Sequence, residues 1–536
     1  MRIPVLVVGA GPTGLTLATA LTQRHVDVRI IDKHPGVLDA TKSAALHART
    51  LEYFRDLGVA DRILAEGQPV EILTLRTGHR DRVTVDFRTL RDTEFPHMVD
   101  IPQARTEQIL IDQLAAKGVT VERSTELHGL EHRPDHIRAS VTNAEGDEQH
   151  IDAAWVVGCD GAHSTVRGLL ELDFAGAQYA DDWVLCDATV DWPLPRNEMT
   201  FSADGDGIYG VFPLPGERRY RLAYTQRTDS SGNLLEPDID DAQKAMARTG
   251  IEGTVAGVDE FWTFNLAHRQ AASFRRGRVF LAGDAGHIHT PFGGQGLNLG
   301  VGDAANLGWK LADVCAGRAP ATLLDTYPAE RQAIARQVVT FTHLGATAML
   351  LRGDPRARLR DLVFTGIQRA GPVRRLMARR LSQLSHSYAH SVTDRFGRLG
   401  VGDRLPDPMM FDGLTNQGVR LHRLVPPDHT LLIAGNPATE KVSKLHHDLT
   451  ERWNTPLAVR VVTPDWRLAR AMTDRMSVVL DRSRDAAVLY GRAPVAYLVR
   501  PDRHIDYAGP VQRGPLDRDL AELATAQPAV PTGSPR

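Results

Sequence analysis

The chain begins with a run of branched apolar residues that leads into a glycine-rich turn. Ile3–Val8 predicts a short strand buried in a parallel sheet, because such strands are covered on both faces and read as continuous apolar runs. The turn opens a predicted helix that reaches about His25, and Val28–Ile31 predicts a second strand that ends at Asp32. This order of strand, helix and strand predicts a βαβ unit.

Two later apolar runs, Trp155–Gly158 and Arg278–Ala282, predict further buried strands that each lead into a turn containing glycine and aspartate. Between about residues 176 and 274 the pattern changes. Strand-like segments such as Gly207–Phe212 and Tyr220–Thr225 are separated by turns rich in Pro and Gly, which is typical of a mixed sheet.

The second half of the chain predicts a helical region and then a separate, smaller α/β unit. The pattern is helical from Pro320 to about His390, and Gly400–Asp407 reads as a linker. Beyond it, helical stretches alternate with predicted strands at Leu431–Ala434, Ala458–Val462 and Val495–Val499. Residues 526–536 are rich in Pro, Ala, Ser and Gly and predict a disordered tail.

Composition narrows the class of protein. The 536 residues suffice for about three domains, and a net charge of −3 gives no electrostatic reason to expect a nucleic acid or an anionic membrane as partner. The three cysteines lack the spacing of a disulfide framework or a zinc site, which favours a reducing, cytoplasmic location. Glycines interrupt the N-terminal apolar run, so it fits a strand, turn and helix better than a signal peptide.

The first glycine-rich turn carries the pattern Gly9-x-Gly11-x-x-Gly14 between a strand and a helix. Its glycines allow a tight turn, close approach to a pyrophosphate and close packing of helix on strand, and the helix N-terminus adds partial positive charge. Asp32 follows Gly14 by eighteen residues, where its carboxylate would accept hydrogen bonds from a ribose. The alternative is a turn without a ligand, in which Asp32 only caps the strand.

Two further segments decide which dinucleotide is bound. One is Cys159–Arg167, which contains Asp160-Gly161, and the other runs from Gly277 through Gly283-Asp284 to Asn298. The glycines at 293, 294 and 296 directly precede a predicted helix, whose positive N-terminus suits the edge of a flavin that becomes anionic on reduction. Asp284 would hold a polyol. The alternative is a second turn that only packs closely.

In this order and spacing the three segments resemble the class A FAD-dependent aromatic hydroxylases typified by para-hydroxybenzoate hydroxylase, and especially the aromatic-polyketide hydroxylases. The resemblance covers about residues 1–345. A further segment of the family matches Ile101–Arg105, and Lys42 stands where the family usually has an arginine near the phosphates. In the family, the motif matched by Asp160-Gly161 is implicated in both FAD and NAD(P)H binding. The cofactor-binding residues implied by the resemblance are Gly9, Gly11, Pro12, Gly14, Asp32, Lys33, Lys42, Gln103, Arg105, Asp160, Asp284, Pro291, Gly294, Gly296, Leu297 and Asn298.

The resemblance also implies a domain organisation. The expected fold is α/β, mixed α+β overall, with a Rossmann-like FAD-binding domain of the glutathione-reductase type over residues 1–75, 100–175 and 275–345. A β-rich substrate-binding domain takes residues 76–99 and 176–274, and a helical connection takes 346–400. Residues 401–525 resemble the thioredoxin-like domain of the polyketide hydroxylases. Because no cysteine follows Cys315, thiol–disulfide exchange there is excluded.

The expected activity is that of a single-component monooxygenase. NADPH or NADH would bind transiently and reduce the FAD, O2 would form a C4a-hydroperoxyflavin, and oxygen would pass to a polycyclic, polyketide-type aromatic substrate. Tyr224 is the candidate for assisting removal of a phenolic proton, and a buried structural tyrosine is the alternative. His287 and His289 lack a third ligand, so no metal is expected.

Other activities remain open from the sequence. A Baeyer–Villiger or epoxidising monooxygenase would share every motif, a flavin oxidase or dehydrogenase would transfer no oxygen, and an assembly protein would only retain FAD. A monomer or a homodimer is expected.

Overall fold

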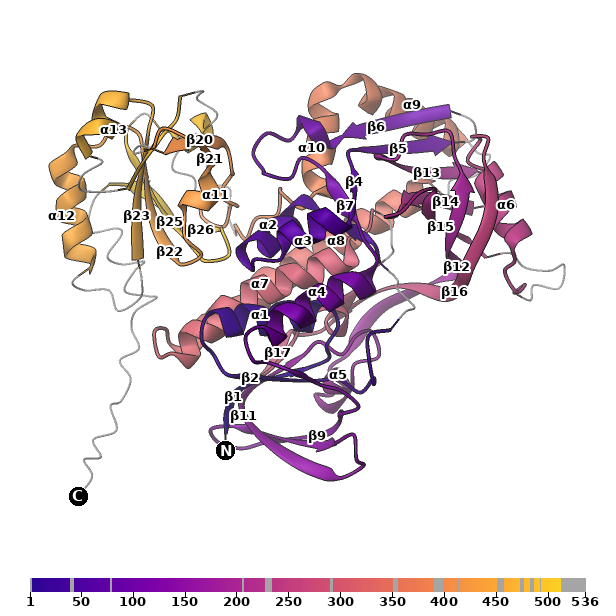
Figure 1. The fold of residues 1–536 in the computed structure, drawn as a ribbon, viewed down its shortest axis with the longest axis horizontal. Helices are drawn as coiled ribbons and strands as arrows, with labels where there is room; N and C mark the ends of the chain where they lie inside the picture. Colours follow the sequence, from indigo (N-terminus) through magenta and orange to yellow (C-terminus); the bar gives the residue numbers. More distant parts are fainter. Residues whose placement is uncertain are drawn as a thin grey trace.

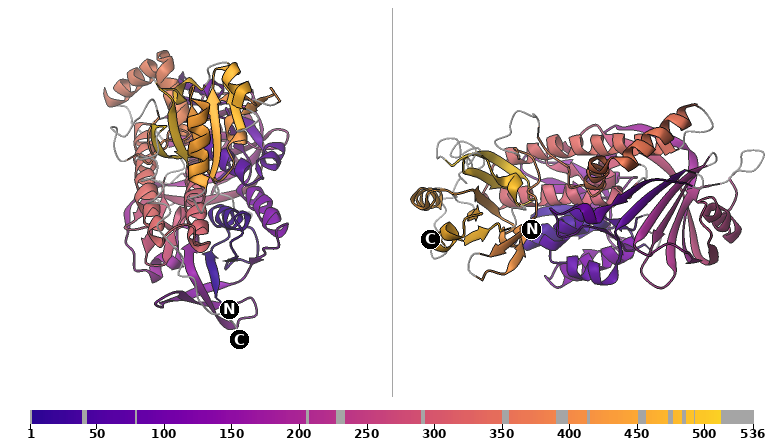
Figure 2. Two further views of the ribbon diagram at one scale, coloured as in Figure 1. Left: turned by 90° about the vertical axis from the view of Figure 1, so that its left-hand side faces the viewer. Right: turned by 90° about the horizontal axis from the view of Figure 1, so that it is seen from above.

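The computed structural model describes residues 2–38, 43–77, 80–204, 207–226, 234–289, 293–349, 355–389, 399–412, 415–450, 457–472, 477–482, 486–491 and 493–511. Two eight-stranded sheets and a seven-stranded C-terminal sheet form three units along the molecule (Figure 1). The C-terminal unit lies at one end, and the second sheet lies at the other (Figure 2). The predicted mixed α/β architecture is confirmed.

The first sheet is built around β1 (Ile3–Val8), which lies between β11 (Glu148–Gly158) and β2 (Val28–Ile31) and runs parallel to both. The predicted bounds of β1 and β2 are confirmed. Strands β10 and β9 extend the sheet from β11 as antiparallel neighbours. The remaining strands are β8 (Val121–Glu122), β9 (Glu126–His132), β10 (Ile137–Thr142), β17 (Arg275–Arg276) and β18 (Val279–Leu281).

Helices α1 (Pro12–Gln23), α4 (Gln103–Ala115) and α7 (Gly296–Cys315) lie side by side next to this sheet (Figure 1). Pro12 stands in the first turn of α1, where its missing N–H costs no helical hydrogen bond. Helices α1 and α7 approach closely because Gly300 and Gly308 of α7 leave room for Thr13 and Ala20 of α1. This packing brings the two predicted glycine-rich turns to the same end of the helix layer.

The second sheet has the order β19-β16-β12-β15-β14-β13-β5-β6. One face packs on α6 (Ile239–Ala247), and the other is continuous with the main core. A small antiparallel sheet, β3-β7-β4, connects the two large ones. The strands are β3 (Ala45–Leu46), β4 (Gln68–Val70), β5 (Ile72–Thr77), β6 (Arg80–Asp86), β7 (Met98–Asp100), β12 (Phe174–Asp191), β13 (Glu198–Asp204), β14 (Gly207–Pro213), β15 (Arg219–Thr225), β16 (Thr254–Ala271) and β19 (His287–Ile288).

The predicted helical region forms α8 (Thr326–Met349), α9 (Pro355–Arg369) and α10 (Gly371–Leu381). Helix α8 packs on α7, and α9 and α10 pack on β6. The shorter helices nearer the N-terminus are α2 (Ala48–Asp56), α3 (Ala60–Glu66) and α5 (Thr165–Leu169).

The C-terminal sheet has the order β21-β20-β24-β23-β22-β25-β26. Strands β22, β23 and β24 are parallel, whereas β25 and β26 form an antiparallel pair at one side. The elements are β20 (Met409–Asp412), β21 (Gly418–Arg420), α11 (Leu421–Leu424), β22 (His429–Ala434), α12 (Thr439–Thr450), β23 (Leu457–Thr463), α13 (Trp466–Met472), β24 (Ser477–Leu480), β25 (Val495–Val499) and β26 (Ile505–Pro510). The predicted tail, 526–536, lies outside the described residues.

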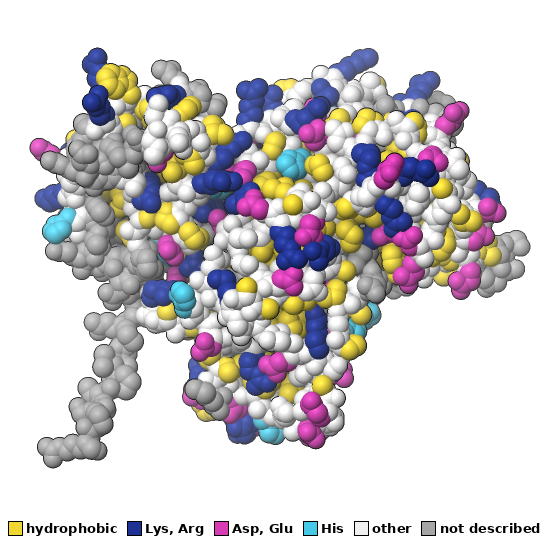
Figure 3. Space-filling model, viewed as in Figure 1, with side chains coloured by type: hydrophobic (Ala, Val, Ile, Leu, Met, Phe, Trp, Pro, Cys, Tyr) yellow, Lys and Arg dark blue, Asp and Glu magenta, His cyan; other side chains and the backbone are white. Residues whose placement is uncertain are grey.

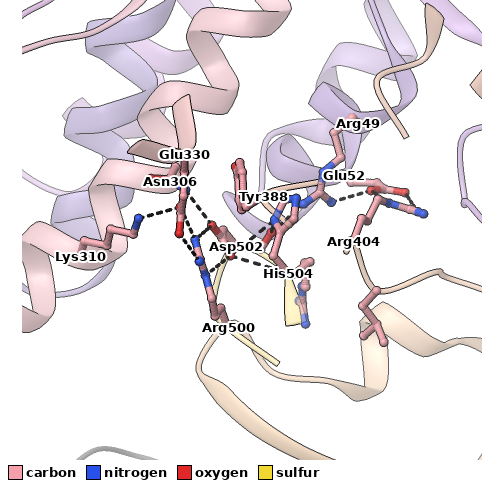
Figure 4. Close-up of polar contacts among 12 residues, drawn as sticks. Arg49, Glu52, Asn306, Lys310, Glu330, Tyr388, Arg404, Arg500, Asp502 and His504 are labelled. Atoms are coloured by element: carbon pink, nitrogen blue, oxygen red, sulfur yellow. Dashed lines mark hydrogen bonds and ion pairs between the residues drawn. The ribbon is translucent and has the colours of Figure 1, made fainter. Parts of the chain in front are cut away.

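Buried ion pairs attach the C-terminal unit to the helices of the first unit (Figure 4). Glu330 of α8 accepts hydrogen bonds from Lys310 Nζ at 2.8 Å and from Arg500 Nη1 at 2.7 Å. Arg500 also pairs with Asp502, whose carbonyl oxygen accepts from Arg49 Nη2 at 2.6 Å. Burial would raise the pKa of Glu330, but Arg500 and Lys310 outweigh it and lower the pKa below its usual range. The carboxylate is therefore charged at neutral pH.

A second set of ion pairs corrects the interpretation of residues 400–407 as a linker. Arg404 is buried and pairs with Glu52 of α2 and with Asp92, and Glu52 also pairs with Arg49 at 2.7 Å. The glycines and prolines of this segment indicated a turn, but its buried arginine ties the turn to α2. Burial would raise the pKa of Glu52, but Arg404 and Arg49 lower it, so its stabilising effect is present at neutral pH and is lost in acid.

On the face shown in Figure 3, acidic and basic side chains are interspersed. Within the described part of the chain, no helix combines the length and apolar character needed to cross a membrane.

We expect Glu52→Gln to destabilise the protein, because it leaves the buried guanidinium of Arg49 without its ion pair and that of Arg404 with Asp92 alone. The loss should be about 3–5 kcal/mol, measured by urea unfolding at neutral pH. Glu131→Gln, at an exposed pair with Arg133, is the matched control and should cost at most about 1 kcal/mol. Equal stability of the two variants would contradict the assignment.

Candidate functional site

The first glycine-rich turn has the shape of a phosphate cradle. Gly9 has a φ of +101°, and a Cβ there would collide with the carbonyl oxygen of Cys159; a Cβ at Gly14 would collide with the carbonyl oxygen of Gly9. A Cβ at Gly11, in contrast, would have no atom within 4 Å. The first and third glycines are therefore required by packing, and the second leaves open space at the N-terminus of α1, where an anion is favoured.

Asp32 is held at the edge of this turn. Its Oδ2 accepts a hydrogen bond from the amide of Ala10 at 2.6 Å, and its Oδ1 accepts from the amide of His34 at 2.8 Å. Arg123 lies 3.8 Å from Oδ1. These bonds fix a carboxylate beside the cradle and leave lone pairs for ribose hydroxyls. Lys33, the next residue, is exposed.

The second glycine-rich turn packs closely against β3. Gly293 and Gly294 have φ values of +74° and +63°, and a Cβ at Gly294 would lie 2.9 Å from the Cβ of Ala45. The buried side chain of Asn298 accepts from the amide of His47 at 2.8 Å and donates to the carbonyl oxygens of Ala45 and Gly294, each at 2.7 Å. The Asn298 side chain therefore orients the turn.

The main-chain amides beside this turn are free of helical hydrogen bonds. Gly296, Leu297 and Asn298 form the first turn of α7, whose N–H groups have no partner within the helix. These amides can meet the anionic edge of a flavin. Lys42 and Pro291, two further predicted contacts, lie outside the described residues.

Asp284 is exposed, although the residues on either side of it are buried. Its strand end is fixed by Asp303 of α7, which is fully buried and accepts from the amide of Gly283 at 3.0 Å, from His287 Nε2 at 2.6 Å and from Arg331 Nε at 2.6 Å. Arg331 was missed by sequence reasoning. The sequence feature that could have indicated it is Asp303, because a buried aspartate on a helix requires a cation nearby.

The other predicted contacts have local partners. Asp160 accepts hydrogen bonds at the start of α5, from Ser164 Oγ at 2.6 Å and from the amide of Val166 at 3.0 Å, and burial raises its pKa. It adjoins the first cradle, since a Cβ on Gly9 would lie 2.8 Å from the Cα of Asp160. Gln103 begins α4 and donates to Glu107, whereas Arg105 pairs with Glu66 of α3 at 2.9 Å.

Tyr224 lies on the face of the second sheet that packs on α6. It shares a buried cluster with Val184, Leu222 and Met246, whereas its neighbour Ala223 belongs to the core that includes the first unit. Side chains alternate between the two faces of a strand, so Tyr224 points away from that core. This arrangement corresponds to the alternative of a buried structural tyrosine.

The opposite, inner face of the second sheet is rich in aromatic side chains. Phe201 and Phe212 pack edge to face with ring centroids 5.2 Å apart. Arg221 lies on the same face, bound to Asp187 through two hydrogen bonds of 2.7 and 3.0 Å, with its guanidinium 5.7 Å from the Trp262 ring. The other members of this inner face are Trp183, Leu185, Ala223 and Phe264.

Asp100, the last residue of β7, was also missed by sequence reasoning. It is fully buried, and neither carboxyl oxygen has a hydrogen-bond partner in the part of the chain that the structure describes. Burial raises its pKa to about 8, and Arg221 opposes the rise. In the sequence, the feature that could have pointed to Asp100 is its position directly before the Ile101–Arg105 segment.

Comparison with known proteins agrees with this geometry. A family model described as FAD binding domain matches residues 2–342. The chain is 36% identical over 435 residues to a 12-dehydrotetracycline 5-monooxygenase/anhydrotetracycline 6-monooxygenase from Streptomyces rimosus, covering 78% of this chain and 83% of the relative. It is 31% identical over 528 residues to a rifampicin monooxygenase from Streptomyces venezuelae, covering 98% of both.

A solved structure is similar over nearly the whole chain. The anhydrotetracycline hydroxylase OxyS from Streptomyces rimosus superposes with a TM-score of 0.74 at 29% identity, covering 99% of this chain and 100% of that one. The similarity therefore includes the C-terminal unit as well as the two glycine-rich turns.

We expect Asp32→Ala to weaken FAD binding by roughly tenfold to a hundredfold, because it removes a charged acceptor worth about 1.5–3 kcal/mol. Titration of the apoprotein with FAD, followed by flavin fluorescence, measures the change. Asp27→Ala, at an exposed position five residues earlier in the same βαβ unit, should bind FAD like the wild type. Unchanged affinity in Asp32→Ala would refute the ribose contact.

Proposed function

Because this chain belongs to the family of FAD-dependent aromatic monooxygenases, we propose that it hydroxylates a fused polycyclic phenol held between the second glycine-rich turn and the inner face of the second sheet. The observation that carries the proposal is the inner face itself, where several aromatic side chains share one face with the fixed Arg221–Asp187 ion pair. Stacked and edge-to-face contacts favour flat ring systems.

The cofactor residues fit FAD. Open space at Gly11 and the fixed carboxylate of Asp32 suit its ADP part, and exposed Asp284 suits the ribityl chain. The first-turn amides at Leu297 and Asn298 suit the flavin ring. Bound FAD, reduced by NADH or NADPH, supplies the activation of dioxygen.

The protein's own residues orient the substrate and exclude water. The ion pair of Arg221 with Asp187 is almost completely buried on the arginine side, so its charges would be held in place beside a bound substrate. The apolar residues around it keep water from the oxygen-transfer step. Tyr224 has no part in this proposal, since its side chain lies on the α6 face.

We assign a discontinuous FAD-binding domain to residues 1–75, 100–175 and 275–345, a substrate-binding domain to 76–99 and 176–274, and a C-terminal domain to 401–525. Strand β5 joins the second sheet from Ile72, at the edge of this division. Support for a thioredoxin-like C-terminal domain comes from the order β23-β22-β25-β26, with a parallel pair next to an antiparallel one. Its role is structural, through the buried ion pairs.

We expect a screen of polycyclic phenols, including anhydrotetracycline, to find a compound that stimulates NAD(P)H oxidation by the purified holoenzyme. Under isotope-labelled dioxygen, one labelled oxygen atom should enter the product as a new hydroxyl group. Phenol, with a single ring, is the control and should give little stimulation. Unlabelled product would indicate an oxidase or dehydrogenase, and a ring-expanded or epoxide product would indicate a different oxygen transfer.

A further inference from the structure

The carboxyl group of Asp100 is buried at a cost in stability, and no hydrogen bond from the described residues offsets that cost. A carboxyl group that is buried without hydrogen bonds costs stability, and buried polar groups in proteins almost always have partners. Asp100 has none among the described residues, and its side chain is fully buried. A group kept in this state is a candidate for contact with a ligand.

The position of Asp100 relates it to the proposed flavin site. It lies opposite Ala45 in the antiparallel pair of β7 with β3, and side chains of directly opposite residues project from the same face of a sheet. The Ala45 side chain is the one that a Cβ on Gly294 would meet at 2.9 Å. The side chain of Asp100 therefore lies on the side of the small sheet that faces the second glycine-rich turn.

The second sheet provides the charged group that acts on Asp100. Arg221 of β15 opposes the rise in the pKa of Asp100, but two hydrogen bonds with Asp187 already compensate its charge. On the other strands beside β7, Asp100 pairs with Ala45 and Gln68, which carry no charge. Arg221 therefore cancels only part of the effect of burial, and the pKa of Asp100 stays at about 8. This value is close to the working range of a general base for a phenol.

A second buried polar atom lies next to the same arginine. The indole Nε1 of Trp262 has no hydrogen-bond partner in the described ranges, and the Trp262 ring lies 5.7 Å from the Arg221 guanidinium. An acceptor in Asp100 and a donor in Trp262 thus both lack partners near one fixed ion pair. A substrate with a hydroxyl group and a second oxygen atom would satisfy both.

We propose that Asp100 is the catalytic base that removes the proton from a phenolic hydroxyl of the substrate, while Trp262 donates to a second substrate oxygen. The proposal rests on the proposed function. The substrate O–H bond breaks, the proton joins a carboxylate oxygen of Asp100, and the electron pair stays on the substrate oxygen. The negative charge thus moves from Asp100 to the phenolate, which makes the ring more reactive toward oxygen transfer. After oxygen transfer, Asp100 returns its proton to the substrate oxygen and becomes a carboxylate again, while the hydroxylated ring carbon releases its proton to solvent and the ring regains its aromaticity.

The test compares wild-type holoenzyme with Asp100→Asn, using anhydrotetracycline as the probe. Above pH 8, the absorption spectrum of the probe bound to oxidised wild-type enzyme should shift toward the phenolate form, and this shift should be absent in Asp100→Asn. Hydroxylation should fall roughly a hundredfold or more. In the wild type the rate should rise with pH through about 8, and this rise should be lost in the variant.

Two further readouts separate a catalytic role from a structural one. FAD content should be unchanged in Asp100→Asn. Because the folded-state pKa is raised, the carboxyl group costs stability as pH rises toward 8, so the variant should melt at a higher temperature than the wild type above that pH. Asp407→Asn is the control: burial raises the pKa of Asp407 to about 7, but it lies in the C-terminal unit and should leave the probe spectrum unchanged.

The outcomes are distinct. Phenolate formation and a wild-type rate in Asp100→Asn would overturn the role of Asp100 while leaving the proposed function intact. Loss of FAD with an unchanged probe spectrum would place Asp100 on the cofactor and also overturn the proposal. If wild-type enzyme itself neither binds nor hydroxylates a polycyclic phenol, the proposed function fails, and the role of Asp100 fails with it.

Discussion

The architecture depends on the compensation of two adjacent buried charges on α8. Glu330 and Arg331 are neighbours in sequence but serve different parts of the molecule. Glu330 binds Lys310 and Arg500 and so attaches the C-terminal unit, whereas Arg331 binds Asp303 and so fixes the strand end before Asp284. A buried charge that loses its partner costs several kcal/mol, so each pair permits only one arrangement of the segments that it joins. One turn of one helix therefore couples the C-terminal unit to the strand end at Gly283.

The same principle separates the scaffold from the site. In the scaffold, buried carboxylates such as Glu52 and Asp303 have arginine partners, and those partners keep the pKa values low. Asp100 is buried to the same extent, but its nearest cation is already bound to Asp187, and its pKa rises. A buried carboxyl group without a partner lowers the stability of the protein, and this loss is expected for a functional group whose partner is a bound ligand. The carboxyl group of Asp100 thus differs from those of Glu52 and Asp303 in how completely its charge is paired.

Features formed by residues close together in the chain could be predicted from the sequence, whereas features formed by distant residues could not. The bounds of β1 and β2 and the packing requirement for glycine at Gly9 and Gly14 follow from short runs of residues, and the structure agrees with them. The inner and outer faces of the second sheet could not be assigned, because strands such as β14 and β15 are buried on both faces and show no alternation. For that reason Tyr224 was a reasonable candidate from sequence and still lies on the α6 face.

Contacts between residues far apart in the chain could not be predicted from the sequence either. Arg404 binds Glu52 across a separation of 352 residues, and composition alone made its segment look like a linker. Asp100 became visible as a candidate only when burial and hydrogen bonding were known. The resemblance to aromatic hydroxylases predicts cofactor residues because they lie in contiguous motifs, whereas the proposed substrate-binding face is distributed over five strands of one sheet.

The central claim is that two glycine-rich turns, about 280 residues apart in the sequence, hold one FAD molecule between them. Its most direct test is the visible absorption spectrum of the purified protein, recorded before and after incubation with FAD and removal of unbound flavin. We expect a flavin spectrum that corresponds to one FAD per chain. A protein that stays colourless after this treatment would contradict the account.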